Sequence, residues 1–280
     1  MPAARDLVLV LDFGAQYTQL IARRVREHRV YCEIHPCTAS FEQIRAMDPR
    51  AIILSGGPAS VYGKDAPMVD RRIFELGVPV LGICYGLQLI AQLLGGRVEP
   101  AAAHEYGHAR VVVERPEGIF HRFAKREALD VWMSHGDRIA ALPAGFQTIG
   151  VSGNTPFCAV GDARRRIYGV QFHPEVAHTP RGADVLASFL FDVTGLAPTW
   201  TPGALTEEAV ASVRARVPPG DHVLCGLSGG VDSAVAAVLC HKALGDRLTC
   251  IFVDNGLLRR GEAEHVVGTF RESLRLPLVA

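Results

Sequence analysis

One cysteine lies between two glycines in Gly82-Ile83-Cys84-Tyr85-Gly86, after the apolar run 78–81 and before the apolar run 87–94. The pattern predicts a strand that turns sharply into a helix, which is the form of a nucleophile elbow. Such a turn strains its central residue, and glycine on either side removes colliding Cβ atoms. A thiol at a helix N-terminus is favoured as thiolate, and the free N–H groups there can bind an oxyanion. A buried structural cysteine is the alternative, and it would be preferred for an isolated cysteine.

A base for this thiol is offered by His173-Pro174-Glu175, which follows the strand-like run 168–172. Residues two apart on an extended segment point the same way, so imidazole and carboxylate can form a hydrogen bond. Pro174 disfavours helix for His173. Two metal ligands or a surface pair are the alternatives, but a zinc site needs further ligands, and neither Cys-x-x-Cys nor a second His-x-Glu occurs. Cysteine, histidine and carboxylate together predict nucleophilic acyl transfer.

These motifs, with the turn Leu54-Ser55-Gly56-Gly57-Pro58, resemble the class I glutamine amidotransferase family. The resemblance implies Cys84, His173 and Glu175 as the catalytic triad. It also implies that the backbone amides of Gly57 and Tyr85 form the oxyanion hole. The glutamine pocket implied by the resemblance comprises Gly56, Gln88, Ser134 and His135. An ordinary surface turn at 56–58 and a structural strand-to-turn role for 132–137 remain open.

A second motif is Ser228-Gly229-Gly230-Val231-Asp232-Ser233, between an apolar strand and the helical run 234–239. A loop of small residues opening a helix offers N–H groups to an anion. It is not a Walker A loop, because the lysine of that motif is absent. It resembles the pyrophosphate loop of the ATP pyrophosphatases. That resemblance implies ATP and pyrophosphate contacts from Ser228, Gly229, Gly230, Val231, Asp232, Ser233 and Ala234, with Asp232 near Mg²⁺.

The next strand, 248–253, ends in Val253-Asp254-Asn255-Gly256-Leu257-Leu258-Arg259. Ligands of open α/β sheets bind where strands end, so Val253 and Asp254 belong beside the first loop. This segment and the order of the two modules resemble the GMP synthase family of carbon–nitrogen ligases in purine biosynthesis. The resemblance implies L-glutamine, xanthosine monophosphate and ATP with Mg²⁺ as substrates, and no prosthetic group. Members of that family dimerise through a C-terminal domain that this sequence does not contain.

The last residues, 276–280, have the pattern of another strand beginning, which predicts the N-terminal part of a longer synthase. A stand-alone glutaminase and a non-catalytic glutamine- or nucleotide-binding fragment are therefore the alternative functions. Amidotransferases that serve anthranilate, carbamoyl phosphate or cytidine nucleotide synthesis are disfavoured, because they lack the Ser-Gly-Gly-Val-Asp-Ser loop directly after the glutaminase.

Composition favours a soluble cytoplasmic enzyme. Lysine plus arginine equals aspartate plus glutamate at 29 each, so neither a nucleic acid nor a membrane surface is indicated as partner. The seven cysteines show no paired spacing, as in reduced proteins. No apolar stretch is long enough to span a bilayer.

His104-Glu105-Tyr106-Gly107-His108 matches the His-Glu-x-x-His zinc-protease pattern. That motif works only on a helix. Here a glycine and a following β-branched run predict a strand, which would separate the two histidines by about 13 Å.

Alternating strands and helices predict a mostly parallel sheet flanked by helices, with a strand-rich antiparallel extension between residues 97 and 172. Strands are expected at 7–11, 51–54 and 78–83, and helices at 17–27, after the capping box 40–43, and at 183–193. We expect three segments: the glutaminase domain at 6–195, a linker at 196–205, and the start of a doubly wound α/β ATP pyrophosphatase domain at 206–280.

Overall fold

The computed structural model describes residues 6–254 and 256–280, without the side chains of 102–104. The chain divides into two compact units between Thr199 and Trp200. This division falls within the segment expected as a linker, but helix α5 (Pro202–Arg216) already begins there. Thr201 caps that helix by accepting a hydrogen bond from the Ala204 N–H, and Pro202 occupies its first turn. These are helix-start signals, which explains why the expected linker ends early.

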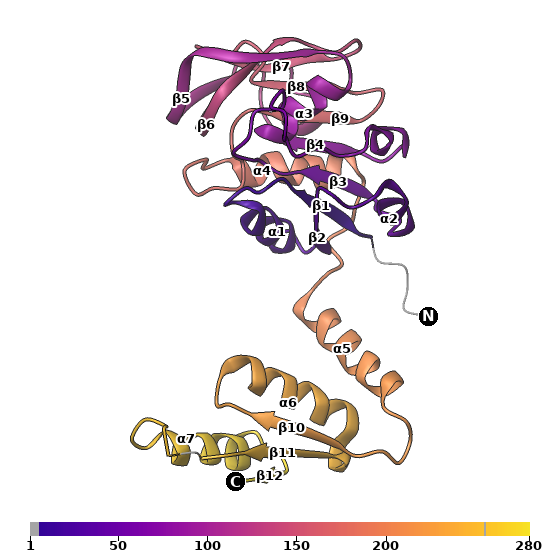
Figure 1. Ribbon diagram of the computed structural model, residues 1–280, viewed down its shortest axis with the longest axis vertical. Coiled ribbons are helices and arrows are strands. Elements are labelled where there is room, and N and C mark those ends of the chain that lie inside the picture. Colours follow the sequence, from indigo (N-terminus) through magenta and orange to yellow (C-terminus); the bar gives the residue numbers. More distant parts are fainter. Residues whose placement is uncertain (1–5, 255) are drawn as a thin grey trace. The chain divides into compact units, whose positions relative to one another are not determined.

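The first unit is built on a nine-stranded sheet in the order β2-β1-β3-β4-β9-β8-β7-β5-β6 (Figure 1). The first five strands in this order run parallel, and the remaining pairings are antiparallel. The strands are β1 (Val8–Asp12), β2 (Cys32–Pro36), β3 (Ala51–Leu54), β4 (Val80–Ile83), β5 (Arg97–Val113), β6 (Ala128–Ala141), β7 (Gln147–Ser152), β8 (Ala159–Asp162) and β9 (Ile167–Val170). The predicted fold class, a parallel sheet with an antiparallel extension, is confirmed.

Helices cover both faces of the parallel part. On one face, α1 (Thr18–Glu27), α4 (Gly182–Ala187) and the π-helical turn η3 (Ser188–Val193) pack on Val8 and Val10. On the other, α2 (Phe41–Ala46), the 3₁₀ turn η1 (Arg71–Glu75) and α3 (Tyr85–Leu93) pack on Leu9 and Leu11. Alternate β1 residues thus point to opposite faces, and both faces are buried, as a parallel sheet requires.

Several local predictions are confirmed, with two differences. Ser40 and Gln43 form the expected capping box. The helix expected over 183–193 changes from α to π geometry at Ser188. The segment 132–137 makes no turn, because β6 continues through it to Ala141; β6 pairs with β5 on both sides of a register shift opposite His135 and Asp137. A second 3₁₀ turn, η2 (Gly118–Phe120), lies between these two strands in sequence.

The second unit contains a three-stranded parallel sheet in the order β10-β11-β12. Its strands are β10 (Val223–Leu227), β11 (Leu248–Phe252) and β12 (Leu278–Val279). Besides α5, it contains α6 (Val231–Leu244), α7 (Glu262–Gly268), the 3₁₀ turn η4 (Gly245–Arg247) and the π-helical turn η5 (Thr269–Ser273).

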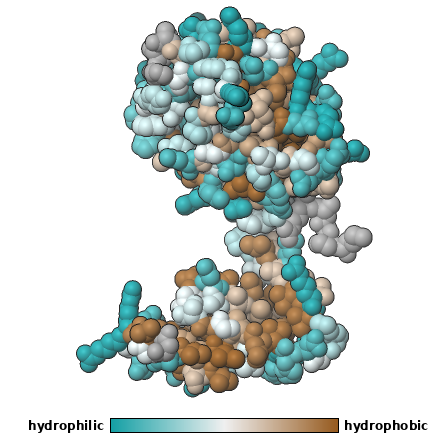
Figure 2. Space-filling model, in the orientation of Figure 1, coloured by the Kyte–Doolittle hydropathy of each residue, from teal (hydrophilic) through white to brown (hydrophobic). Residues whose placement is uncertain are grey.

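This unit exposes much apolar surface, visible as brown areas over it in Figure 2. Val231 is 77% exposed, Leu224 and Val253 are each 69% exposed, and Val279 is 59% exposed. Only a small group of residues around Leu248, Cys250 and Phe270 is buried. The buried core of the second unit is therefore small for the number of apolar side chains that this unit contains.

Strands β3 and β4 approach α3 so closely that only glycine fits. A Cβ on Gly86 would lie 2.3 Å from the Leu54 carbonyl oxygen, and one on Gly82 would lie 2.6 Å from the Gly86 backbone. The two glycines flanking Cys84 are thus required by backbone contact between three elements.

Replacing Gly86 by Ala is expected to lower the free energy of unfolding by about 2 kcal/mol or more, because the new methyl group overlaps the β3 backbone. Urea unfolding of the variant measures this. Gly153→Ala is the control, since a Cβ there meets nothing within 4 Å. Equal stabilities of the two variants would contradict the packing argument.

Candidate active site

Cys84 sits at the junction of β4 and α3 with φ 52° and ψ −104°, a backbone conformation that non-glycine residues rarely adopt. Its N–H donates to the Val170 carbonyl on the neighbouring strand β9 at 2.8 Å, and the Gly86 N–H donates to the Ser55 carbonyl at 3.1 Å. These bonds hold the strained residue from two sides. The elbow predicted from the sequence is present, and the side chain of Cys84 is only 5% exposed.

His173 and Glu175 lie just beyond β9, which pairs directly with β4. The His173 Nδ1 and Glu175 Oε1 atoms are 2.7 Å apart, and both residues are buried. The predicted hydrogen bond is confirmed, but its segment is not a strand: β9 ends at Val170. The chain bends after β9, and two hydrogen bonds to the backbone of His173 hold this bend. The His173 N–H donates to the Trp132 carbonyl, and the Thr179 hydroxyl donates to the His173 carbonyl.

Since Nδ1 faces Glu175, the other ring nitrogen of His173 remains for Cys84, with which the ring interacts electrostatically. Burial alone lowers the pKa of His173, but the hydrogen bonds and charges of Cys84 and Glu175 outweigh it and raise the pKa to about 10. Near neutral pH the ring is therefore protonated beside the sulfur.

The two residues predicted to supply oxyanion-binding amides lie against each other. A Cβ on Gly57 would be 3.3 Å from Tyr85 Cγ and 2.8 Å from the Phe13 carbonyl oxygen. Tyr85 is the first residue of α3, where N–H groups have no intrahelical acceptor. Its phenol is turned into the core and donates to the Pro67 carbonyl at 2.6 Å. Burial raises the pKa of this phenol to about 12.

A cavity of about 560 Å³ opens beside the sulfur. Cys84, Gly57, Gln88, Ser134 and His135 all line it, which brings together most of the predicted glutamine pocket. Gly56 is not among its lining residues. Gly56 packs instead against Cys84 and His173: a Cβ on Gly56 would be 3.2 Å from His173 Cε1 and 3.8 Å from Cys84 Cβ.

Two polar residues at the site were not predicted. Gln171 is fully buried, donates from Nε2 toward Cys84 Sγ at 3.7 Å, and accepts from Gln88 Nε2 at 3.3 Å. Tyr62 closes over the cavity and donates to Asp137 Oδ1 at 2.7 Å. Gln171 had a usable signal, because it is the one polar residue of the apolar run before His173. Tyr62 had none, since the contact joins segments 75 residues apart.

In the second unit, the loop 228–230 joins β10 to α6, as predicted. The hydroxyl of Ser233 accepts from the Ser228 N–H at 3.3 Å and lies 3.1 Å from the Ser228 hydroxyl. Gly229 takes φ +80°, and Asp232 falls in the first turn of α6. Because Leu227 and Phe252 are register partners, Val253 and Asp254 lie at the same sheet edge as this loop. Asp254 Oδ1 accepts from the Gly256 N–H at 2.9 Å.

The zinc-protease pattern at 104–108 lies within strand β5, so the helix that the motif requires is absent. The side chain of His104 lies outside the described residues. Among the residues that the structure describes, no group of three or more histidine, cysteine, aspartate and glutamate side chains could hold a metal ion. The helices within the described ranges include none that is both long and apolar enough to cross a bilayer.

The chain belongs to the class I glutamine amidotransferase family, whose model matches residues 9–193. A second family model, NAD synthase, matches residues 206–265. Both matches agree with the fold of the corresponding unit and with the motif found in it.

Curated relatives named glutamine-hydrolysing GMP synthase align over nearly the whole chain. Those of Heliobacterium modesticaldum, Phenylobacterium zucineum and Thermomicrobium roseum are 53%, 52% and 54% identical over 100%, 99% and 98% of it. The alignments cover 54%, 53% and 51% of those proteins, so the chain spans about half their length.

A solved structure from Thermoplasma acidophilum, provisionally assigned as one subunit of a GMP synthase, matches with a TM-score of 0.58 at 28% identity. The match covers 68% of this chain and 94% of that one. PurLQS of Thermotoga maritima shares the fold at 16% identity, with a TM-score of 0.56 over 66% of this chain and 98% of that one.

Replacing Glu175 by Gln is expected to lower the pH at which His173 titrates, because the charge and carboxylate hydrogen bond that hold its proton are lost. In the unchanged chain the midpoint is expected near 10, against 6.5 for a free histidine. Nitrogen-15 NMR of labelled histidine measures both midpoints. An unchanged midpoint in Glu175→Gln would refute this account.

The raised pKa of His173 also determines how this residue's contribution to folding stability changes with pH. The folded chain binds the His173 proton more tightly than the unfolded chain, so the stabilisation is complete below pH 6.5 and is lost as the pH rises to about 10.

Proposed function

We propose that the first unit hydrolyses L-glutamine with Cys84 as nucleophile, His173 as acid and base, and Glu175 as the residue that orients His173. The observation that carries the proposal is the strained Cys84 elbow beside a buried histidine whose Nδ1 is 2.7 Å from Glu175. The Cys84 elbow and the His173–Glu175 pair are typical of enzymes that transfer acyl groups through a nucleophile. Because the chain belongs to the class I glutamine amidotransferase family, we infer that the acyl group comes from glutamine.

In this mechanism Cys84 reacts as the thiolate, paired with the protonated ring of His173; its sulfur attacks the amide carbon, and the former carbonyl oxygen becomes an oxyanion. The backbone N–H groups of Gly57 and Tyr85 would stabilise that charge; the close packing of the two residues supports this role. The protonated ring of His173 gives its proton to the departing nitrogen, which leaves as ammonia. The neutral ring then removes a proton from water, whose oxygen attacks the thioester and releases glutamate and Cys84.

Glutamine would bind in the 560 Å³ cavity, with Gln88, Ser134 and His135 in its walls and Gly56 beneath the reacting pair. The side-chain amide of Gln171 would donate a hydrogen bond to the sulfur of Cys84, because its Nε2 atom is directed at Sγ.

The second unit would bind ATP as its Mg²⁺ complex. We propose that Ser228, Gly229, Gly230, Val231, Asp232, Ser233 and Ala234 hold the pyrophosphate, with Asp232 toward the metal ion. Val253 and Asp254 would contact the nucleotide from the same sheet edge. The position of the loop at the N-terminus of α6 supports this, and the hydrogen bonds between Ser228 and Ser233 fix the loop there.

Within a longer protein, these two activities would complete GMP synthesis. ATP would adenylate xanthosine monophosphate, and ammonia from glutamine would displace AMP. Relatives named GMP synthase that are more than 50% identical support this substrate set. We further propose domain bounds of 6–195 for the glutaminase and 206–280 for the pyrophosphatase portion, and dimerisation through a C-terminal domain as in the resembled family. All seven cysteines are free, which supports a reducing, cytoplasmic location.

Two other functions are tested by the same assay, in which the chain receives glutamine, ATP and xanthosine monophosphate. Glutamate without AMP or GMP indicates a glutaminase acting alone. No product indicates a protein that only binds glutamine or nucleotide.

Cys84→Ala is expected to lower glutamine turnover by at least about 10⁴-fold, because no thioester can form. Release of glutamate measures it, and mass spectrometry of the acid-quenched chain locates the adduct. Cys225→Ala in strand β10 is the control and should keep full turnover. A Cys84→Ala variant that still hydrolyses glutamine would disprove the assignment of the nucleophile.

Asp232→Asn is expected to weaken binding of Mg²⁺–pyrophosphate about tenfold, because a carboxylate near the ion is lost. Titration calorimetry on the chain measures the affinity. Asp246→Asn, just after the other end of α6, removes the same charge away from the loop and should change nothing. Equal affinities of the two variants would refute this role of Asp232.

A further inference from the structure

A buried charged pair joins the two long strands of the antiparallel extension. Glu105 on β5 and His135 on β6 are register partners, and Glu105 Oε2 lies 2.9 Å from His135 Nε2. The residues are 9% and 4% exposed. Burying such a pair opposes folding unless hydrogen bonds satisfy both partners, so its remaining contacts are informative.

The hydrogen-bond partners determine where the protons are. His135 Nδ1 lies 2.9 Å from the Asp137 carbonyl, which can only accept, so Nδ1 must carry a proton. Glu105 Oε2 also accepts from the Thr155 hydroxyl at 2.6 Å. Each ring nitrogen of His135 thus faces an oxygen that can accept a hydrogen bond, the Asp137 carbonyl at Nδ1 and the Glu105 carboxyl at Nε2.

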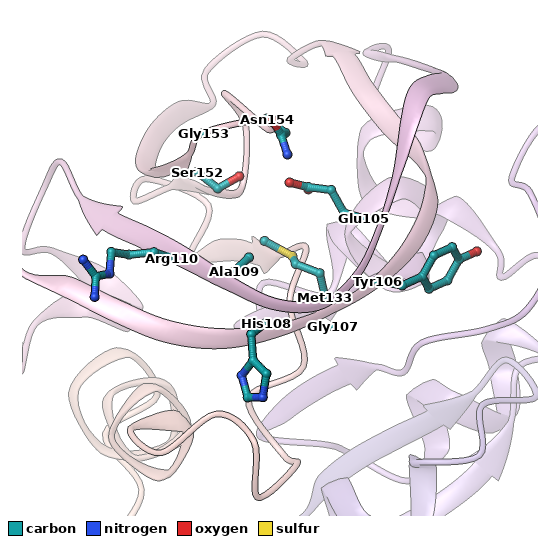
Figure 3. Close-up of a pocket in the computed structure, with 10 residues that line it drawn as sticks. All are labelled: Glu105, Tyr106, Gly107, His108, Ala109, Arg110, Met133, Ser152, Gly153 and Asn154. Atoms are coloured by element: carbon teal, nitrogen blue, oxygen red, sulfur yellow. The ribbon is translucent and has the colours of Figure 1, made fainter.

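This pair forms part of a wall between two cavities. His135 lines the 560 Å³ cavity that also contains Cys84. Glu105 lines a separate cavity of about 420 Å³, where its carboxylate extends toward Ser152 and Asn154 (Figure 3). The Glu105 carboxyl group is thus on the side of the 420 Å³ cavity, and the His135 ring is on the side of the cavity that contains Cys84.

The substrate of the proposed reaction carries both an ammonium and a carboxylate group. Among the described residues that line the Cys84 cavity, only His135 can carry a positive charge. Asp137 supplies a negative one, held by the Tyr62 hydroxyl. The cavity thus has one charge of each sign for a zwitterion.

We propose that Glu105 is a positioning residue that keeps His135 doubly protonated, and that the resulting positive charge selects the α-carboxylate of glutamine. The inference rests on the proposed glutamine hydrolysis. Because both N–H groups of His135 are occupied, its charge acts on the substrate through space. The effect falls on binding, since the α-carboxylate is remote from the amide where bonds change.

Glu105→Gln keeps the shape of the side chain and removes its charge. The KM for L-glutamine is expected to rise about tenfold while kcat changes less than about threefold, because ground state and transition state lose the same attraction. For L-glutamine methyl ester, which has no carboxylate, kcat/KM should stay unchanged. Glu99→Gln is the matched control, as Glu99 lies on the same strand and pairs with Arg138 on β6 outside the cavity.

Glu105→Ala offers a second test, because the 420 Å³ cavity leaves room for a small carboxylate behind His135. Sodium formate is expected to restore most of the lost affinity for glutamine, whereas sodium chloride at equal ionic strength should not. A merely structural carboxylate would not be replaced in this way.

The outcomes separate this inference from the proposed function. If the unchanged chain does not hydrolyse glutamine, the proposed function fails. If it does, but Glu105→Gln affects glutamine and its ester equally, the inference is overturned. Nitrogen-15 NMR of His135 in the unchanged chain needs no variant: two protonated nitrogens at pH 7 are expected, and one bare nitrogen would overturn the inference.

Discussion

The first unit depends on the strained backbone of one residue. Cys84 holds a positive φ because β4 must turn into α3 within one residue, and the turn survives because the neighbouring elements fix it. Val170 binds the N–H of Cys84 from β9, and Ser55 binds the N–H of Gly86 from the end of β3. Glycine at 82 and 86 lets the backbones come within contact distance. The position of the sulfur is thus supported by the packing of three strands and a helix.

Sheet topology then determines what meets the sulfur. Strands β4 and β9 are parallel neighbours although about ninety residues separate them in sequence, so the bend after β9 brings His173 to the elbow. The antiparallel ribbon of β5 and β6 supplies the opposite wall, with Ser134, His135 and Asp137 along one strand. The same rule acts in the second unit, where parallel β10 and β11 place their following loops at one edge.

Charge is distributed through buried pairs on both sides of the cavity. Glu175 lies 2.7 Å from Nδ1 of His173, and Glu105 lies 2.9 Å from Nε2 of His135. Each pair couples a carboxylate that does not line the cavity to a ring that faces the reacting region. One pair would serve bond breaking and the other recognition, since of the two rings only that of His173 interacts with Cys84.

The sequence alone determined most of the elements and predicted Cys84, His173 and Glu175 as a group, because the signals for them are local. Apolar periodicity located the strands, glycines marked the elbow and the pyrophosphate loop, and His173 and Glu175 are two residues apart. Where a local signal was ambiguous the structure adds detail: the segment 132–137, for which a strand-to-turn role was left open, continues a long strand, and α5 begins within the expected linker. Only the tertiary structure decided that Glu105 meets His135, that Gln171 reaches the sulfur, and that Tyr62 closes on Asp137. These contacts depend on strand register and close packing between distant segments, which no short stretch of sequence encodes.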